Sequence, residues 1–259
     1  MKTTLKKRLY ALITICSVTI LCLSFLLIKI SKKETEVINN STPKPTSVPT
    51  STPITQSKEP SPTSTPIPTV EVETIDTMTD SSLYRIVNEN HPLDQNYVPD
   101  NLVYFENSNQ MVRGDLVENL SKLFQDAKQV GYDLSLISGY RTYDQQVDLY
   151  NMYVESYGQE YANSIDDKPG KCEHQLGLMI DIGLSDGTCT LQDCFSSTSA
   201  SQWLEQNAYK YGFIERYPKD KESITGILYS SWNYRYVGIE QAKLIYDSGL
   251  TMEEYYGVN

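Results

Sequence analysis

Histidine is scarce in this sequence, since the 259 residues contain only His91 and His174. A catalytic zinc ion normally takes three protein ligands from His, Cys, Asp or Glu and leaves a fourth position for water. A metal site built from three imidazoles is therefore excluded. Any site that uses His174 must draw its other ligands from carboxylates, thiols or weaker amide oxygens.

Basic residues are also few, with 22 Lys and Arg against 33 Asp and Glu and a formal net charge of −11. Residues 1–33 hold seven of the basic residues and no acidic residue. The rest of the chain therefore carries 15 basic and 33 acidic residues, a net charge of −18. Nucleic acid is not expected as a partner, because phosphate binding needs a basic patch.

Charge is absent from Leu9 to Ile28, and Lys6, Lys7 and Arg8 precede this apolar stretch. About 20 apolar residues suffice to span a bilayer. We predict a membrane anchor over residues 1–33 that crosses the membrane through residues 9–28. A cleaved signal peptide is the competing interpretation, although its apolar core is usually only about 7–15 residues long.

Ser, Thr and Pro dominate residues 34–79, and such a composition cannot bury enough apolar surface to fold. We predict a disordered linker there. It would be either a spacer that holds the domain away from the membrane or an inert tether without a specific reach. Residues 80–259 form the one predicted folded domain. Cys189 and Cys194 flank a short polar loop, so a local disulfide or two separate thiols would fit. We expect a single-pass protein of the cell membrane with an extracytoplasmic domain.

Apolar periodicity predicts an α+β fold, and the fold we expect has a small central antiparallel sheet with flanking helices. Helix starts are marked by capping residues such as Thr142. We expect strands over 83–87, 134–137, 178–182 and 234–237, and helices over 113–130, 142–157, 200–211 and 239–246.

One motif carries most of the chemical information. His174 and Asp181 lie seven residues apart with Leu178, Met179 and Ile180 between them, at the boundary of a loop and a predicted strand. This pattern indicates two ligands of a metal site held by a rigid scaffold. A hydrogen-bonded structural pair without metal is the alternative.

Four motifs together resemble the VanY-type D-alanyl-D-alanine carboxypeptidases, zinc peptidases that trim the terminal D-alanine from peptidoglycan stem peptides. The resemblance covers about Leu83 to Asn259 in order and spacing. The motifs are Ser138-Gly-Tyr-Arg-Thr-Tyr-Asp-Gln-Gln146, Glu173-His-Gln-Leu-Gly-Leu-Met-Ile-Asp-Ile182, Tyr211-Gly-Phe-Ile-Glu-Arg-Tyr-Pro218 and Trp232-Asn-Tyr-Arg-Tyr-Val-Gly238.

The resemblance implies a VanY-type fold, zinc as cofactor and a peptidoglycan stem peptide as partner. It implies that His174 and Asp181 bind zinc and that Arg141 faces the substrate carboxylate or the developing oxyanion. Gln146 would hydrogen-bond the stem peptide. The alternatives are a salt bridge at a helix start for Arg141 and an exposed amide for Gln146. His91 is expected to be structural.

The last motif departs from the family pattern of Glu-x-Trp-His, because this chain reads Ser230-Ser-Trp-Asn233. Ser230 takes the position of the general base and Asn233 that of the third zinc ligand. A serine has no useful basicity near neutral pH, and losing a general base typically costs a factor of about 10²–10⁴.

Three further residues bear on the altered site. Cys172 stands where the family commonly has a substrate-facing serine, and its thiolate could instead bind metal. Glu173 and Glu222 are the nearest candidates for a replacement base. We expect a carboxypeptidase-like protein that recognises stem peptides with impaired catalysis. An active zinc enzyme with an unusual ligand set and an interaction protein that uses another face are the alternatives.

Overall fold

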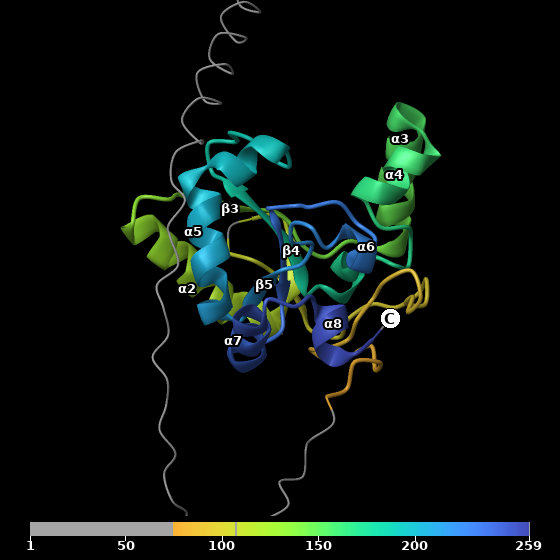
Figure 1. The fold of residues 1–259 in the computed structure, drawn as a ribbon, viewed down its shortest axis with the longest axis horizontal. Coiled ribbons are helices and arrows are strands. Elements are labelled where there is room, and N and C mark those ends of the chain that lie inside the picture. The colour runs from red at the N-terminus through yellow and green to blue at the C-terminus, as the bar shows by residue number, and fades with distance from the viewer. Residues whose placement is uncertain (1–74, 107, 259) are drawn as a thin grey trace, which may run out of the picture. The chain divides into compact units, whose positions relative to one another are not determined.

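Four strands form the central antiparallel sheet (Figure 1) of a computed structural model that describes residues 75–106 and 108–258. The strands lie in the order β3-β4-β6-β5. Two shorter strands, β1 and β2, form a separate antiparallel pair. The bounds are β1 Leu102–Tyr104, β2 Met111–Arg113, β3 Leu134–Ser138, β4 Met179–Leu184, β5 Phe213–Glu215 and β6 Asn233–Tyr236.

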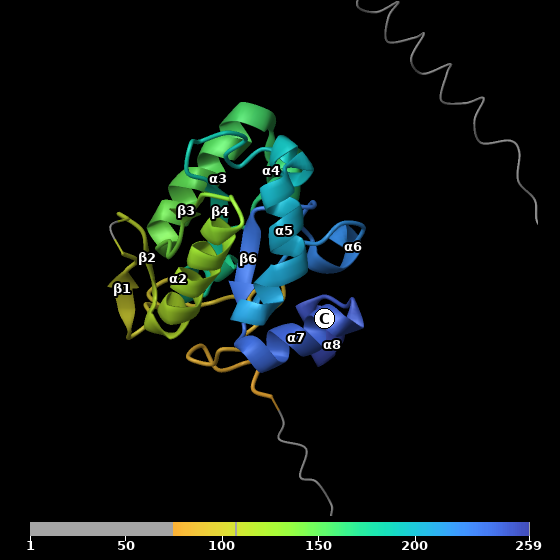
Figure 2. The ribbon, with the colours of Figure 1, turned by 90° about the vertical axis from the view of Figure 1, so that its left-hand side faces the viewer.

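Helices α2 and α5 cover one face of this sheet (Figure 2), while α3 and α4 project beyond it (Figure 1). Three short 3-10 helices span 173–176, 193–197 and 208–211. The α-helices are α2 Gly114–Gln129, α3 Tyr143–Tyr157, α4 Gln159–Ile165, α5 Ser199–Asn207, α6 Glu222–Thr225, α7 Ile239–Ser248 and α8 Met252–Tyr256.

The main core lies between α2 and the sheet. Leu116, Leu120 and Leu123 recur at helical spacing on one face of α2 and are fully buried. They share a single apolar cluster with Ile180 and Ile182 of β4. Because side chains alternate along a strand, Asp181 points to the opposite face of the sheet from these two isoleucines.

The register of the sheet then aligns three polar residues. Asp181 of β4 is paired with Asn233 of β6 on one side and with Ser138 of β3 on the other. The pairing between β3 and β4 is irregular between Leu136 and Ser138. The three polar residues therefore form one row across the sheet, on the face away from α2.

Much of the predicted secondary structure is confirmed. The helix predicted over 113–130 is α2, and the strands predicted over 134–137, 178–182 and 234–237 are β3, β4 and β6 with small changes at their ends. Thr142 caps α3 as predicted, since its hydroxyl accepts from the Gln145 backbone N–H at 3.1 Å. The closing helix is α7.

Two predictions are wrong. Residues 83–87 form no strand, because the backbone N–H groups of Ile86 and Val87 donate to the Thr77 carbonyl and the Glu173 side chain instead of to a neighbouring strand. The helix predicted over 200–211 is divided into α5 and a 3-10 turn that begins at Ala208.

The predicted anchor through residues 9–28 and nearly all of the linker over 34–79 lie outside the described residues. Within 75–106 and 108–258, no helix has the length and apolar character needed to cross a bilayer. Of the two arrangements left open for Cys189 and Cys194, the structure has the disulfide.

Candidate active site

His174 lies beside the row that Ser138, Asp181 and Asn233 form on the sheet. It comes after β3 and α3 in the chain. His174 Nδ1 lies 2.6 Å from the carbonyl oxygen of Gly139, to which it donates. Gly139 cannot carry a side chain, because a Cβ would lie 2.3 Å from the Met111 carbonyl oxygen. This contact orients the ring so that Nε2 lies 3.4 Å from Asp181 Oδ1.

The His174 and Asp181 pair has the spacing of two zinc ligands. Ligands about 2.0–2.2 Å from a tetrahedral ion lie about 3.3–3.6 Å from each other, and 3.4 Å falls within that range. Donation of Nδ1–H to a carbonyl is also the usual support for a histidine that binds metal through Nε2. The structure therefore brings together the first two predicted ligands.

Asn233 takes a different role at the third position. Its Nδ2 donates a hydrogen bond to Asp181 Oδ1, the oxygen that faces His174. Turning the amide over would bring its oxygen against that carboxylate oxygen, and two acceptors repel unless a cation separates them. The donor set of one imidazole, one carboxylate and one carboxamide does not complete a catalytic zinc centre. Among the described residues, no cluster of three His, Cys, Asp or Glu side chains could hold a metal.

Ser230 lies 5% exposed beside this row, and its hydroxyl donates to the Leu228 carbonyl at 3.3 Å. The described residues that line the cleft do not include Ser230. The position of the expected general base therefore holds neither a carboxylate nor a side chain open to the cleft.

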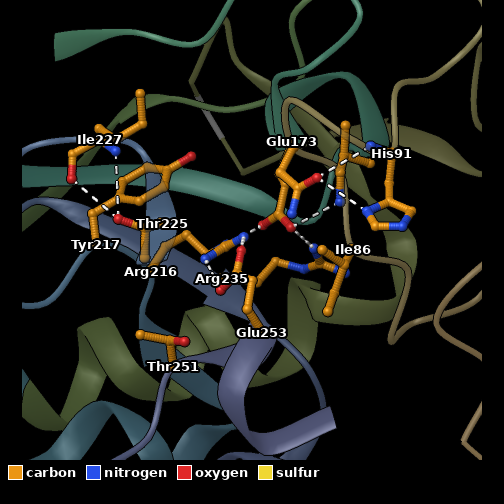
Figure 3. A network of polar contacts seen from close by, with 12 residues as sticks. Ile86, His91, Glu173, Arg216, Tyr217, Thr225, Ile227, Arg235, Thr251 and Glu253 are labelled. Atoms are coloured by element: carbon orange, nitrogen blue, oxygen red, sulfur yellow. Dashed lines mark hydrogen bonds and ion pairs between the residues drawn. The ribbon is translucent and has the colours of Figure 1, made fainter. Parts of the chain in front are cut away.

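Glu173 is fully buried in an ion-pair network, which Figure 3 shows from close by. Its carboxylate lies 2.8 Å from Arg216 Nε and 2.9 Å from Arg235 Nη1, and Arg216 also pairs with Glu253 at 2.6 Å. Burial alone would raise the pKa of Glu173, but the two guanidinium charges outweigh it and hold the pKa below its ordinary value. Glu173 is thus a structural ion, unsuited to the role of replacement base.

Three other residues considered from the sequence are not among the described residues that line the cleft. Glu222 begins α6 and is not among the described residues that line the cleft. His91 is confirmed outside the site, with Nδ1 3.1 Å from Asn88 Oδ1. Cys172 is 2% exposed, and burial first and the Asp167 charge second raise the pKa of its thiol well above the ordinary value. Cys172 is not among the described residues that line the cleft, so the structure gives it no direct contact there.

Arg141 and Gln146 lie together. The alternative of an exposed amide is wrong for Gln146, which is buried, and its contact with a stem peptide stays a prediction. Arg141 Nη1 donates to Gln146 Oε1 at 2.6 Å, and Nη2 donates to Ser138 Oγ at 3.2 Å. Nη2 also lies 4.0 Å from Asp181 Oδ2. The Arg141 side chain remains 16% exposed, whereas Gln146 is 2% exposed. Arg141 can therefore reach a ligand, while Gln146 holds the guanidinium in place.

Asp166 and Asp167 form another wall of the cleft, and neither was predicted from the sequence as a site residue. Gln146 Nε2 donates to Asp166 Oδ2 at 3.0 Å, and Tyr217 donates its hydroxyl to Asp167 Oδ2 at 2.6 Å. Burial raises the pKa of Asp166, and burial raises the pKa of Asp167 to about 7. The only signal in the sequence was two adjacent acids in a loop, which is also the usual composition of a solvated turn.

These groups surround a cleft of about 660 Å³. Arg141 is the sole Lys or Arg among the described residues that line it. The disulfide-closed loop adds Leu191 and Asp193 to the wall. The polar and charged groups at the centre are Ser138, Arg141, Asp166, Asp167, His174, Asp181 and Asn233. The arrangement suits an anionic group held at Arg141 beside the His174 and Asp181 pair.

Comparison with known proteins decides the family. Residues 109–239 match the sequence model of the family VanY, D-alanyl-D-alanine carboxypeptidase. This chain belongs to the VanY family. It is 39% identical over 195 residues to the putative carboxypeptidase YodJ of Bacillus subtilis (strain 168), an alignment that covers 72% of this chain and 71% of YodJ.

Two solved VanY-type structures have the same fold. The LdcB LD-carboxypeptidase is 40% identical with a TM-score of 0.63, over 69% of this chain and 87% of LdcB. A mutant of the vancomycin-resistance D,D-pentapeptidase VanY in complex with Zn(II) is 35% identical with a TM-score of 0.58, over 66% of this chain and 96% of that chain. The VanY fold is thus shared with a zinc-bound relative, whereas the position predicted here for the third ligand is the amide of Asn233.

Proposed function

We propose that this protein binds the carboxyl-terminal end of a D-alanine-ended peptidoglycan stem peptide and does not hydrolyse it at a rate typical of a VanY carboxypeptidase. The observation that carries the proposal is the hydrogen bond from Asn233 Nδ2 to Asp181 Oδ1. This hydrogen bond uses the amide that stands at the position predicted for the third metal ligand. The same cleft still contains Arg141, which can bind an anion.

Recognition depends on Arg141. The guanidinium is permanently charged and planar, and its fork matches a carboxylate. Gln146 and Ser138 fix its direction without burying it completely. The free carboxylate of a peptide would therefore find a preorganised partner at the centre of the cleft. A peptide whose terminal carboxylate is converted to an amide would lose this interaction.

Catalysis lacks the glutamate and the histidine that the family pattern places at positions 230 and 233. Hydrolysis needs an activated water, which zinc supplies when bound in VanY enzymes by lowering the pKa of that water. Ser230 cannot accept its proton near neutral pH, and Glu173 is committed to Arg216 and Arg235. Of the acids that line the cleft, Asp166 accepts a hydrogen bond from Gln146 and Asp167 accepts one from Tyr217. A loss of at least about 10²–10⁴ in rate is expected from the missing base alone.

A second candidate, an active zinc carboxypeptidase with an unusual ligand set, is favoured by one observation. The 3.4 Å separation of His174 Nε2 and Asp181 Oδ1 is that of two ligands on one ion. Binding of zinc would have to break the contact between Asn233 and Asp181. Metal analysis of the purified protein after dialysis against zinc separates the two candidates, with a stoichiometry near zero expected here.

Peptide binding is tested by calorimetric titration of a pentapeptide ending in D-Ala-D-Ala, a tetrapeptide ending in one D-Ala, and the pentapeptide with an amidated terminus. We expect at least one free-carboxylate peptide to bind and the amidated peptide to bind at least about tenfold more weakly, as for a charged hydrogen bond. Equal affinity for the free and amidated peptides would contradict recognition by Arg141.

We further propose that the domain lies outside the cytoplasm, tethered to the cell membrane. The apolar stretch of residues 9–28, the Ser/Thr/Pro-rich residues 34–79 and the disulfide between Cys189 and Cys194 support this location. Membrane fractionation followed by protease treatment of intact cells tests it. Recovery of the chain in the soluble cytoplasmic fraction would contradict the proposal.

A further inference from the structure

Helices α3 and α4 carry three tyrosines that form a row along the cleft, called here the tyrosine row: Tyr153, Tyr157 and Tyr161. The ring centroids of Tyr153 and Tyr157 lie 6.3 Å apart, and those of Tyr157 and Tyr161 lie 5.7 Å apart. All three side chains line the cleft. Tyr153 and Tyr157 are one helical turn apart, and Gly158, with φ of 84°, turns the chain so that Tyr161 continues the row.

The outer part of the row is unusually exposed for aromatic side chains. Tyr157 is 61% exposed and Tyr161 is 51% exposed. Both belong to the pair of helices that projects beyond the sheet in Figure 1. Single exposed apolar residues are common, but adjacent rings in a row that borders a cleft indicate a binding surface.

The inner end of the row reaches the centre of the cleft. Tyr153 is half-buried, and its pKa is raised by burial first and by the charge of Asp166 second, with Arg141 acting in the opposite direction. Tyr153 therefore lies within electrostatic range of the residues proposed to hold the peptide carboxylate. A ligand that enters at Arg141 can leave the cleft along the tyrosine row.

The chemistry of the row suits a sugar. The faces of tyrosine rings are electron-rich, and the C–H bonds on one face of a pyranose carry slight positive charge, so the two stack. Phenolic hydroxyls at the ring edges can bond sugar hydroxyls. The row offers no formal charge of its own, and the charged side chains that line the cleft apart from Arg141 are Asp166, Asp167, Asp181 and Asp193, which disfavours an anionic group away from Arg141.

The length of the stem peptide decides whether a ligand held at Arg141 can extend to the tyrosine row. In peptidoglycan, the amino end of each stem peptide is attached to a glycan strand. An extended stem of four or five residues reaches about 13–18 Å. Tyr157 lies eleven residues, or about 16 Å, along α3 from Gln146, the partner of Arg141, so a stem whose carboxylate is at Arg141 would bring its sugar-bearing end near Tyr157.

We propose that the tyrosine row is a carbohydrate-binding platform on which a sugar ring of the peptidoglycan glycan strand stacks. This inference rests on the proposed binding of a stem peptide in the same cleft. It assigns to the platform the recognition of peptides still attached to glycan, in preference to free peptides.

The test compares two ligands with the full-length protein, without added zinc: a free stem pentapeptide and the same pentapeptide linked to its disaccharide. We expect the disaccharide peptide to bind about three- to tenfold more tightly, the factor of one aromatic stacking contact. Tyr157→Ala and Tyr161→Ala should each remove most of this preference while leaving the affinity for the free pentapeptide unchanged. Tyr157→Phe, which keeps the ring, should retain it.

Tyr104 provides the matched control, because it is 65% exposed on β1 and does not line the cleft. Tyr104→Ala should change neither affinity. Circular dichroism of each variant checks that it is folded. Arg141→Ala should weaken binding of both ligands by the same factor, which separates the peptide site from the platform.

The outcomes that overturn the inference are distinct from those that overturn the proposed function. Equal affinity of the wild-type protein for both ligands, with the free pentapeptide bound, overturns the platform alone. The platform is also overturned if Tyr157→Ala weakens the affinity for the free pentapeptide as much as the affinity for the disaccharide-linked pentapeptide. The Tyr157 ring would then contact the peptide and not the sugar. If the free pentapeptide does not bind, titration with the β-1,4-linked tetramer of N-acetylglucosamine decides: binding lost in Tyr157→Ala supports the platform, and no binding overturns it.

Discussion

The buried carboxylate of Glu173 offers a stability test whose size follows from the structure. Glu173→Gln keeps the shape of the side chain but removes its charge. Arg216 then keeps Glu253 as an ion-pair partner, whereas Arg235 loses the one partner it has among the described residues. Glu173, Arg216 and Arg235 have side chains no more than 1% exposed. Removing one member of a buried ion pair typically costs about 3–5 kcal/mol.

Urea denaturation measures this loss. With a slope of about 2 kcal/mol/M, the midpoint should fall by roughly 1.5–2.5 M. Because the pKa of Glu173 is below its ordinary value of 4.5, its contribution is present above that pH and is lost as the pH falls. The difference between the two proteins should therefore shrink in acid. Glu118→Gln, which removes an exposed pair with Lys122, is the control and should not shift the midpoint.

A fall of less than about 0.5 M for Glu173→Gln at neutral pH would refute the reasoning, because it would mean that the network contributes little to stability. It would also reopen the interpretation of Glu173 as a free carboxylate available to the site.

Two further predictions concern the cleft. Asp167, whose folded pKa of about 7 exceeds its ordinary 3.8, contributes stability below pH 4 that is lost as the pH rises through 7. Asp167→Asn should flatten this pH dependence of the urea midpoint, and an unchanged pH profile would contradict it. Arg141→Ala should weaken binding of a free-carboxylate peptide about 10–100-fold in calorimetry. Arg141→Lys keeps the charge but not the planar guanidinium, so it should restore only part of the lost affinity. Full restoration would contradict a contact made through two guanidinium nitrogens.

The sequence predicted the parts of the fold that depend on local pattern. The buried face of α2 follows from Leu116, Leu120 and Leu123 at helical spacing, and the start of α3 follows from the capping side chain of Thr142. The local pattern did not reveal that residues 83–87 form no strand. This segment is buried like a strand, but its hydrogen bonds go to a turn and to Glu173, which lies 86 residues from Val87 in the chain.

The candidate site was predicted where a motif marks it and missed where only the fold assembles it. His174, Asp181 and Asn233 meet because the register of β4 and β6 places Asp181 opposite Asn233. Asp167 meets Tyr217 through a contact between distant segments that no local pattern encodes. The burial of Cys172 and Glu173 likewise depends on neighbours from elsewhere in the chain, which sequence spacing does not reveal.

The central claim, that the cleft is kept while the catalytic groups are lost, is tested most directly by measuring D-alanine release from a D-Ala-D-Ala pentapeptide with and without added zinc. We predict no release by the wild-type protein and zinc-dependent release by a variant that combines Asn233→His with Ser230→Glu. Zinc-dependent release by the wild-type protein that is abolished by His174→Ala would contradict the account.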